Sequence, residues 1–320
     1  MTLRVALVYT VEASRPDEGS HPHGAEQVSN TNQAVMDVLK QLGHEAHLVP
    51  GDIDLLRKLR DVRPDVVFNN CTGIHDKSSQ PQVAGMLELS RIPFTGSGQC
   101  AHVLALYKPL TKMVLMHHHI PTPHFAVAEY ADTPLPSTLT YPVIVKPEHE
   151  GSSIGISARS VAMSASEATA AVRVVVSTYG QPALIEEFIV GREFTVGVLG
   201  GERTRILPPI EVMFDTRQGF YTHNVKAQDA VETKCPAIIE PILHQRIEEV
   251  VLAAFQALGC RDYARIDLRV GMDGVPYVID VNTLPGLEPG YSDYPKAAGA
   301  AGISYAQLID HLLQCALRRS

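Results

Sequence analysis

The sequence predicts a mixed α/β protein in which a parallel sheet near the N-terminus is followed by antiparallel strands. Two observations support this fold class. Strands are predicted over residues 3–10, 44–50 and 64–70, with helices over 25–43 and 53–62. This alternating order implies a parallel, Rossmann-like sheet. Residues 265–286 instead read as two strands joined by a short turn, which is the pattern of an antiparallel hairpin.

Length and composition limit the classes of protein to which this chain can belong. Its 320 residues are enough for two or three domains, and 45% apolar with 19% charged residues is typical of a soluble globular protein. The net charge of −8 disfavours a broad basic surface, so we expect no nucleic-acid partner. Five scattered cysteines without a CxxC pair argue against a zinc site or a disulfide framework.

The N-terminal apolar run is short and is predicted to be a strand rather than a signal peptide. No segment approaches the length that a membrane-spanning helix needs. Together with the cysteine pattern, these features lead us to expect a cytoplasmic protein without a membrane partner.

Downstream of the parallel sheet, two further units are expected. The predicted elements are a helix over 100–120, a strand within 120–130, two short strands within 141–157, a helix over 164–180, a strand over 182–189, a hairpin over 191–212, a long loop over 212–237 and helices over 241–260 and 304–319. We therefore divide the chain into an N-terminal unit (1–98), a central unit (99–185) and a C-terminal unit (186–320).

The predicted hairpin carries a cluster of polar side chains. Alternation places Arg265, Asp267 and Arg269 on one face of the first strand, opposite its apolar residues. On the second strand, Asp280 and Asn282 share a face, and Ile279 and Val281 lie opposite. Pairing of the strands brings two carboxylates and one amide oxygen together, a set suited to magnesium. The same pattern is also that of an ordinary hairpin with its polar residues in solvent.

Two other stretches suggest a phosphate-bearing ligand. Lys146 ends an apolar strand and is followed by a Gly/Ser loop (151–155), which can supply a cation and several backbone N–H groups. The alternative is a plain hairpin turn. Glu186, Glu187 and Glu193 lie between apolar strands and can hold the amino group and hydroxyls of a nucleoside, although glutamates are also common on surfaces.

Taken together, these stretches resemble the D-alanine–D-alanine ligase family of ATP-grasp enzymes, most clearly from residue 95 to residue 282. The resemblance implies the ATP-grasp fold, with an N-terminal Rossmann-like domain, a small central lid domain and a C-terminal antiparallel catalytic domain. It also implies ATP and Mg²⁺, for which Mn²⁺ can substitute, two amino-acid substrates and a homodimer.

The resemblance assigns roles to individual residues. Nucleotide binding falls to two phosphate lysines, a glycine-rich loop, an adenine and ribose segment and a γ-phosphate lysine: Lys108, Lys146, Gly151, Ser152, Ser153, Glu186, Glu187, Phe188, Ile189, Glu193 and Lys226. The magnesium ligands are Asp267, Asp280 and Asn282. Catalysis is assigned to Arg265, Ser152, Lys226 and the backbone of Gly286, and a closing loop to residues 213–235.

The sequence departs from the family on the amino-acid side. The glutamate that holds the first substrate's ammonium group is displaced to Glu26, and Ser292 is the candidate for the second substrate's carboxylate. The loop tyrosine is replaced by Ala227, and a magnesium glutamate by Asp280. We therefore expect an ATP-dependent carboxylate–amine ligase of the D-alanine–D-alanine type. A specialised-metabolite ligase for other amino acids and a nucleotide-binding protein without turnover are the alternatives.

Overall fold

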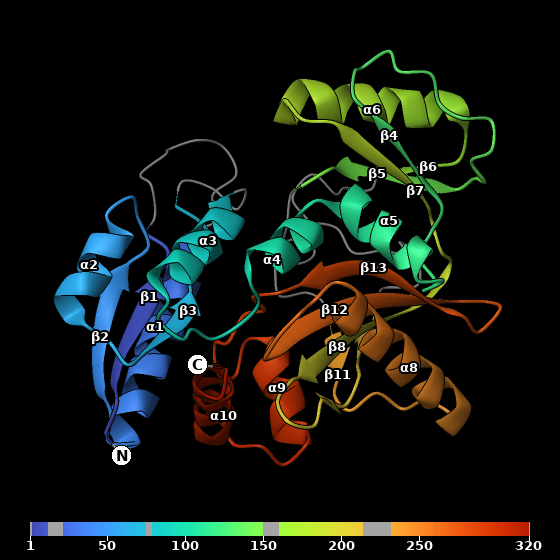
Figure 1. The fold of residues 1–320 in the computed structure, drawn as a ribbon. Helices are drawn as coiled ribbons and strands as arrows, with labels where there is room; N and C mark the ends of the chain where they lie inside the picture. The colour runs from blue at the N-terminus through green and yellow to red at the C-terminus, as the bar shows by residue number, and fades with distance from the viewer. Residues whose placement is uncertain (1, 12–21, 75–78, 150–159, 214–231, 320) are drawn as a thin grey trace.

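The structure is a computed structural model that describes residues 2–11, 22–74, 79–149, 160–213 and 232–319. Figure 1 shows three groups of strands, each covered by helices. Within the described residues, no helix combines the length and apolar character needed to cross a membrane.

The N-terminal sheet is parallel, as predicted, with the strand order β2 (Glu45–Pro50), β1 (Arg4–Tyr9), β3 (Val66–Asn70). Alternate residues of β1 bury on opposite faces, since side chains in a strand alternate. Val5 and Leu7 pack toward α1 (Pro22–Gln41), whereas Ala6 and Val8 pack toward α2 (Leu55–Val62) and α3 (Gln80–Ser90). Both faces of this sheet are therefore apolar and covered, which explains the continuous apolar run of β1.

The central sheet is antiparallel, with the order β4 (Phe125–Ala128), β7 (Ala183–Glu187), β5 (Val143–Pro147), β6 (Val161–Ala162). Helix α6 (Ala165–Tyr179) covers it through Ala168, Val172 and Val175. This helix begins at Ser164, whose hydroxyl accepts the backbone N–H of Glu167, and ends at Gly180 with φ +62°. The capping residues explain why its ends were predictable from the sequence.

The C-terminal sheet is also antiparallel and has the order β11 (Glu232–Lys234), β10 (Ile210–Met213), β8 (Gly191–Leu199), β12 (Tyr263–Gly271), β13 (Pro276–Asn282), with β9 (Arg205–Ile206) also paired to β8. Helix α8 (Pro241–Ala257) covers one face through Ile247, Val251 and Ala254. The predicted hairpin is thus two neighbouring strands of a larger sheet.

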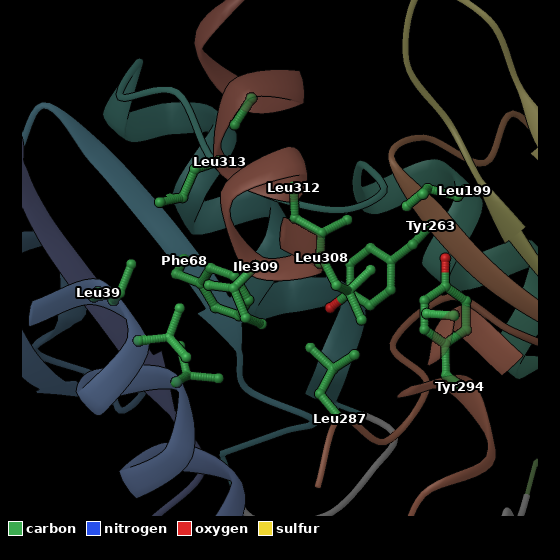
Figure 2. Close-up of a cluster of buried hydrophobic side chains, with 14 of the residues drawn as sticks. Leu39, Phe68, Leu199, Tyr263, Leu287, Tyr294, Leu308, Ile309, Leu312 and Leu313 are labelled. Atoms are coloured by element: carbon green, nitrogen blue, oxygen red, sulfur yellow. The ribbon is translucent and has the colours of Figure 1, made fainter. Parts of the chain in front are cut away.

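A single buried cluster joins the N-terminal and C-terminal units (Figure 2). Helix α10 (Tyr305–Leu317) lies between them and packs Ile309, Leu312 and Leu313 into this cluster, where Leu39 and Phe68 come from the N-terminal unit. From the other side, Tyr263 and Tyr294 meet edge to face, with ring centroids 5.7 Å apart. The C-terminal helix therefore belongs to the core of both units.

The structure differs from the predicted elements in several places, and within the loop expected over 212–237 the described residues include the strand β11. The helix expected over 100–120 is two helices, α4 (Gln99–Leu106) and α5 (Lys108–His117), which break at Tyr107 because Pro109 cannot continue a helix but is tolerated in a first turn. A short helix, α9 (Asp293–Ala300), forms where none was expected. Both α4 and α5 contribute to the C-terminal core through Ala105 and Leu115.

The division at residues 98/99 and 185/186 remains our proposal. The second boundary falls inside β7.

Candidate active site

The polar cluster of the hairpin forms because β12 and β13 pair antiparallel, with Asp267 opposite Asp280 and Arg265 opposite Asn282. The register shifts after Asp267, so that Leu268 pairs with Val278 and Ile279 is the additional residue. Val278 and Val281 consequently enter the core, whereas Ile279 does not. The prediction that Ile279 and Val281 share one face was therefore wrong, because strict alternation does not allow for a β-bulge.

Arg265 and Asp267 form a bidentate ion pair beside this bulge. Arg265 Nε and Nη2 donate to the two carboxylate oxygens of Asp267 at 2.9 and 2.8 Å. The hydroxyl of Thr195, on β8, also donates to Asp267, and Asn282 Nδ2 lies 3.4 Å from Asp267 Oδ2. Burial lowers the pKa of Arg265, but Asp267, Asp293 and Asp280 outweigh it and raise that pKa above its ordinary value. The guanidinium is therefore charged and fixed in orientation.

The three predicted magnesium ligands come together as the sequence predicted. Asp267, Asp280 and Asn282 supply only oxygen donors suited to a hard cation, so they fit Mg²⁺ or Mn²⁺. The set contains two carboxylates and an amide. Among the residues that the structure describes, no group of three or more His, Cys, Asp or Glu side chains is arranged to hold a metal.

A buried chain of charges lies next to Asp280. Lys146 Nζ is 2.7 Å from Glu186 Oε2, and Lys112 Nζ is 3.0 Å from Glu186 Oε1. The side chains of Lys112, Lys146 and Glu186 are 3%, 10% and 2% exposed. Lys108 begins α5 and is also buried, and a small hollow is lined by Lys108, Lys112 and Asp280. Three lysines against two carboxylates, those of Glu186 and Asp280, leave a positive site that fits phosphate.

Lys112 is the member of this group that the sequence analysis missed. Its signal is the spacing of four residues from Lys108 on α5, which places both lysines on one helical face. Burial lowers the pKa of Lys112 to about 8, against the opposite effect of Glu186. Burial alone raises the pKa of Glu186, but Lys112 and Lys146 reverse this and lower it, so the carboxylate is ionised.

The predicted adenine and ribose segment connects the central and C-terminal sheets. Phe188 N–H donates to Pro142 O at 2.8 Å, and Glu187 N–H donates to His124 O at 2.9 Å. Glu193, on β8, lies 3.4 Å from Nη1 of Arg269, whose guanidinium stacks on the Phe188 ring with the carbon 4.5 Å from the centroid. Arg269 is thus a second residue whose place in the site was not predicted, although its strand face was.

The amino-acid side of the site includes residues from two units. Ser292 caps α9, is buried, and accepts the backbone N–H of Glu288 at 3.1 Å. The Glu288 carboxylate in turn accepts Asn30 Nδ2 of α1 at 2.9 Å. At the ends of the N-terminal strands, Asn70 donates to Asn32 at 2.8 Å.

Some predicted residues cannot be placed. Gly151, Ser152, Ser153 and Lys226 lie outside the described residues, as does most of the loop over 213–235. Glu26 falls within α1, but its side chain is likewise outside the described part.

Comparison with known proteins identifies the family. The model of the family described as "D-ala D-ala ligase C-terminus" matches residues 116–314. The chain belongs to the D-alanine–D-alanine ligase family. A D-alanine–D-alanine ligase from Bordetella avium is 34% identical over 297 residues, which cover 89% of each chain. An uncharacterized protein, y4sG, from Sinorhizobium fredii is 36% identical over 297 residues, covering 89% of this chain and 87% of that protein.

A solved D-alanine–D-alanine ligase from Bacillus anthracis, complexed with ATP, has the same fold. It superposes with a TM-score of 0.79 over 99% of this chain and 98% of that chain, at 24% sequence identity. The predicted ATP-grasp fold is therefore confirmed, and the chain is a carbon–nitrogen ligase of the D-alanine–D-alanine ligase family, as predicted from the sequence.

Proposed function

We propose that this protein joins two amino acids of the D-alanine type through an acyl phosphate and releases ADP and phosphate. The observation that carries the proposal is the convergence of the Lys112–Glu186–Lys146 chain, Lys108 and Asp280 beside the Arg265–Asp267 pair. A positive site for phosphate thus lies next to an oriented guanidinium and a carboxylate pair.

In the first step, the carboxylate oxygen of one amino acid attacks the γ-phosphorus of ATP, and ADP leaves. Lys108 and Lys146 neutralise phosphate charge and align the nucleotide, which is the main contribution that a protein makes to phosphoryl transfer. Glu186 fixes the position of the Lys146 ammonium group through an ion pair of 2.7 Å. Asp267, Asp280 and Asn282 would hold Mg²⁺ or Mn²⁺, which supplies further charge neutralisation when bound.

In the second step, the amine of the other amino acid attacks the acyl carbon and phosphate leaves. A tetrahedral oxyanion develops, for which Arg265 and the backbone N–H of Gly286 are the proposed donors. Asp267 holds the Arg265 guanidinium in one orientation, so little reorganisation is needed as the charge develops. The ammonium group of this amino acid first loses a proton to solvent, which frees the lone pair of the attacking nitrogen, and after attack the nitrogen loses a second proton to solvent or to the departing phosphate.

The substrates are proposed as D-amino acids, as in the named relatives. A cytoplasmic homodimer remains a prediction from the sequence.

The test is a screen with ATP, Mg²⁺ and single or paired D- and L-amino acids, reading phosphate release and the mass of the products. We expect D-alanine to give a dipeptide with one phosphate per bond. Asp267→Asn should abolish this activity, whereas Asp273→Asn, in the exposed turn of the same hairpin, should retain it. If no amino acid gives phosphate release, the proposed function is excluded. If the protein prefers other amino acids to D-alanine, those amino acids replace D-alanine as the proposed substrate.

A further inference from the structure

Three polar side chains from distant parts of the sequence meet at the end of β13, next to Asn282. Gln80 is the first residue of α3, His102 lies in α4, and Thr283 directly follows β13. Gln80 Nε2 is 2.8 Å from His102 Nδ1 and 3.3 Å from Thr283 Oγ1, and His102 Nδ1 is 2.7 Å from Thr283 Oγ1. The three side chains therefore form a closed triangle of polar contacts, in which Gln80 donates to Thr283 and the single lone pair of His102 Nδ1 is shared by Gln80 and Thr283.

The triangle is shielded from water. His102 is 1% exposed and Thr283 is 2% exposed, while Gln80 is half-buried. Hydrogen bonds between buried groups are costly to break, because the separated groups find no water in their place. Burial lowers the pKa of His102 to about 4, so its ring is neutral at neutral pH and Nδ1 can accept a hydrogen bond. These three contacts hold their elements in a fixed relative position.

The elements joined in this way belong to different units, since α3 is part of the N-terminal unit and Thr283 follows β13 of the C-terminal sheet. Helix α3 packs on the N-terminal sheet through Val83 and Leu87, and lies beside α4 (Figure 1). Thr283 is bonded directly to the proposed metal ligand Asn282 and lies three residues before Gly286. A displacement of Thr283 would move both the oxygen cluster and the oxyanion donor relative to the N-terminal unit.

We propose that Gln80, His102 and Thr283 are positioning residues that hold the Asn282–Gly286 segment in register with the N-terminal unit. The proposal rests on the proposed function, because its consequence is the alignment of the activated carboxylate with the attacking amine. If this alignment is loosened, ATP is still bound and the acyl phosphate still forms, but water intercepts more of it. The triangle thereby contributes to coupling between phosphate release and bond formation.

The experiment compares phosphate released with dipeptide formed in paired variants. Thr283→Val removes the hydroxyl at constant volume and Thr283→Ser retains it. His102→Leu removes the acceptor, and His102→Asn places an amide oxygen close to the position of Nδ1. Ser164→Ala is the control, because it removes a hydroxyl that accepts the backbone N–H of Glu167 at the start of α6, in the central unit.

We expect Thr283→Val and His102→Leu to raise the ratio of phosphate to dipeptide and to lower kcat by about tenfold, the scale of effect typical of groups that orient metal ligands. The affinity for ADP, measured by calorimetry, should stay within about twofold of wild type, since the triangle does not touch the lysine site. Thr283→Ser and His102→Asn should restore the ratio of phosphate to dipeptide to that of wild type. The control should lose thermal stability without changing the ratio.

A ratio and kcat equal to wild type in both Thr283→Val and His102→Leu would overturn the proposal. Failure of the proposed function is distinguishable, because wild type itself would then release no phosphate. In that case hydrogen–deuterium exchange decides the question. Thr283→Val should accelerate exchange at the start of α3 as well as in residues 283–286, whereas Ser164→Ala should accelerate it at neither place. Exchange confined to residues 283–286 would also overturn the proposal.

Discussion

Arg265 has two tasks at the scale of the single residue. It is the proposed donor to the oxyanion, and it also occupies both oxygens of Asp267 at 2.8 and 2.9 Å. A bidentate pair of this kind fixes direction as well as charge. Glu186 likewise fixes the positions of Lys112 and Lys146 through an ion pair to each, in a site from which water is largely excluded.

Replacement of Arg265 tests the first of these tasks. Arg265→Ala should lower kcat by about 100-fold or more with little change in ATP affinity, because an oxyanion donor acts mainly in the transition state. Arg265→Lys keeps the charge but loses the bidentate contact, so its kcat should fall between those of wild type and Arg265→Ala. Steady-state kinetics measures both values, and an unchanged kcat in Arg265→Ala would remove this residue from the mechanism.

Lys112 should be important for stability although it is not a predicted phosphate ligand. Lys112→Met breaks one contact of a fully buried carboxylate and should reduce the free energy of unfolding by about 3 kcal/mol, as for other buried pairs that lose one partner. Lys58→Met, in the more exposed pair with Asp52, should cost less than about 1 kcal/mol. Urea unfolding measures both, and equal small losses would contradict this account of the buried chain.

The neutral state of His102 predicts a pH dependence of stability. Its pKa is about 4 in the folded protein and 6.5 when exposed, so the unfolded chain binds more protons between these values. The contribution to stability is therefore complete above pH 6.5 and falls as the pH drops toward 4, by roughly 3 kcal/mol. The free energy of unfolding, measured in urea at several pH values, should fall in this way for wild type but not for His102→Asn. The same pH dependence in both proteins would contradict the account.

At the scale of elements, the active site depends on a strand pair with an irregular register. Residue types and turn residues were sufficient to predict that 265–282 forms a hairpin and that its two aspartates converge. They were not sufficient to predict that Ile279 leaves the regular alternation, because a bulge depends on how Val278 and Val281 pack into the core beneath α8. The break between α4 and α5 was visible in the sequence as Pro109, but its effect on the path of the chain was not.

Helix α10 provides a test of packing at this scale. Leu312 is fully buried between the N-terminal and C-terminal units, so Leu312→Ala should cost 2–5 kcal/mol, the usual range for such a cavity. Leu89→Ala, at a side chain that is 76% exposed, should cost less than about 0.5 kcal/mol. Thermal or urea unfolding distinguishes the two, and a loss below 1 kcal/mol for Leu312→Ala would argue against a shared core.

At the scale of the whole molecule, the site combines contributions from all three units. Lys146 and Glu186 come from the central sheet, Arg265 and Asp267 from the C-terminal sheet, and Asn30 from the N-terminal unit. Lys146 and Glu186 could be selected from the sequence because they lie near the ends of apolar strands, and the structure brings them into contact; their binding of nucleotide is a proposal. The sequence did not predict the pairs Arg269–Glu193 and Asn30–Glu288, because such pairs form only when segments far apart in sequence pack together.

The central claim is that this protein activates a carboxylate by phosphoryl transfer from ATP. The most direct measurement uses an amino-acid substrate labelled with ¹⁸O in its carboxylate and determines the mass of the phosphate released with the dipeptide. An acyl phosphate intermediate predicts that one ¹⁸O atom appears in each phosphate, because that oxygen leaves with phosphorus when the amine attacks. Unlabelled phosphate, or label in AMP, would contradict the account.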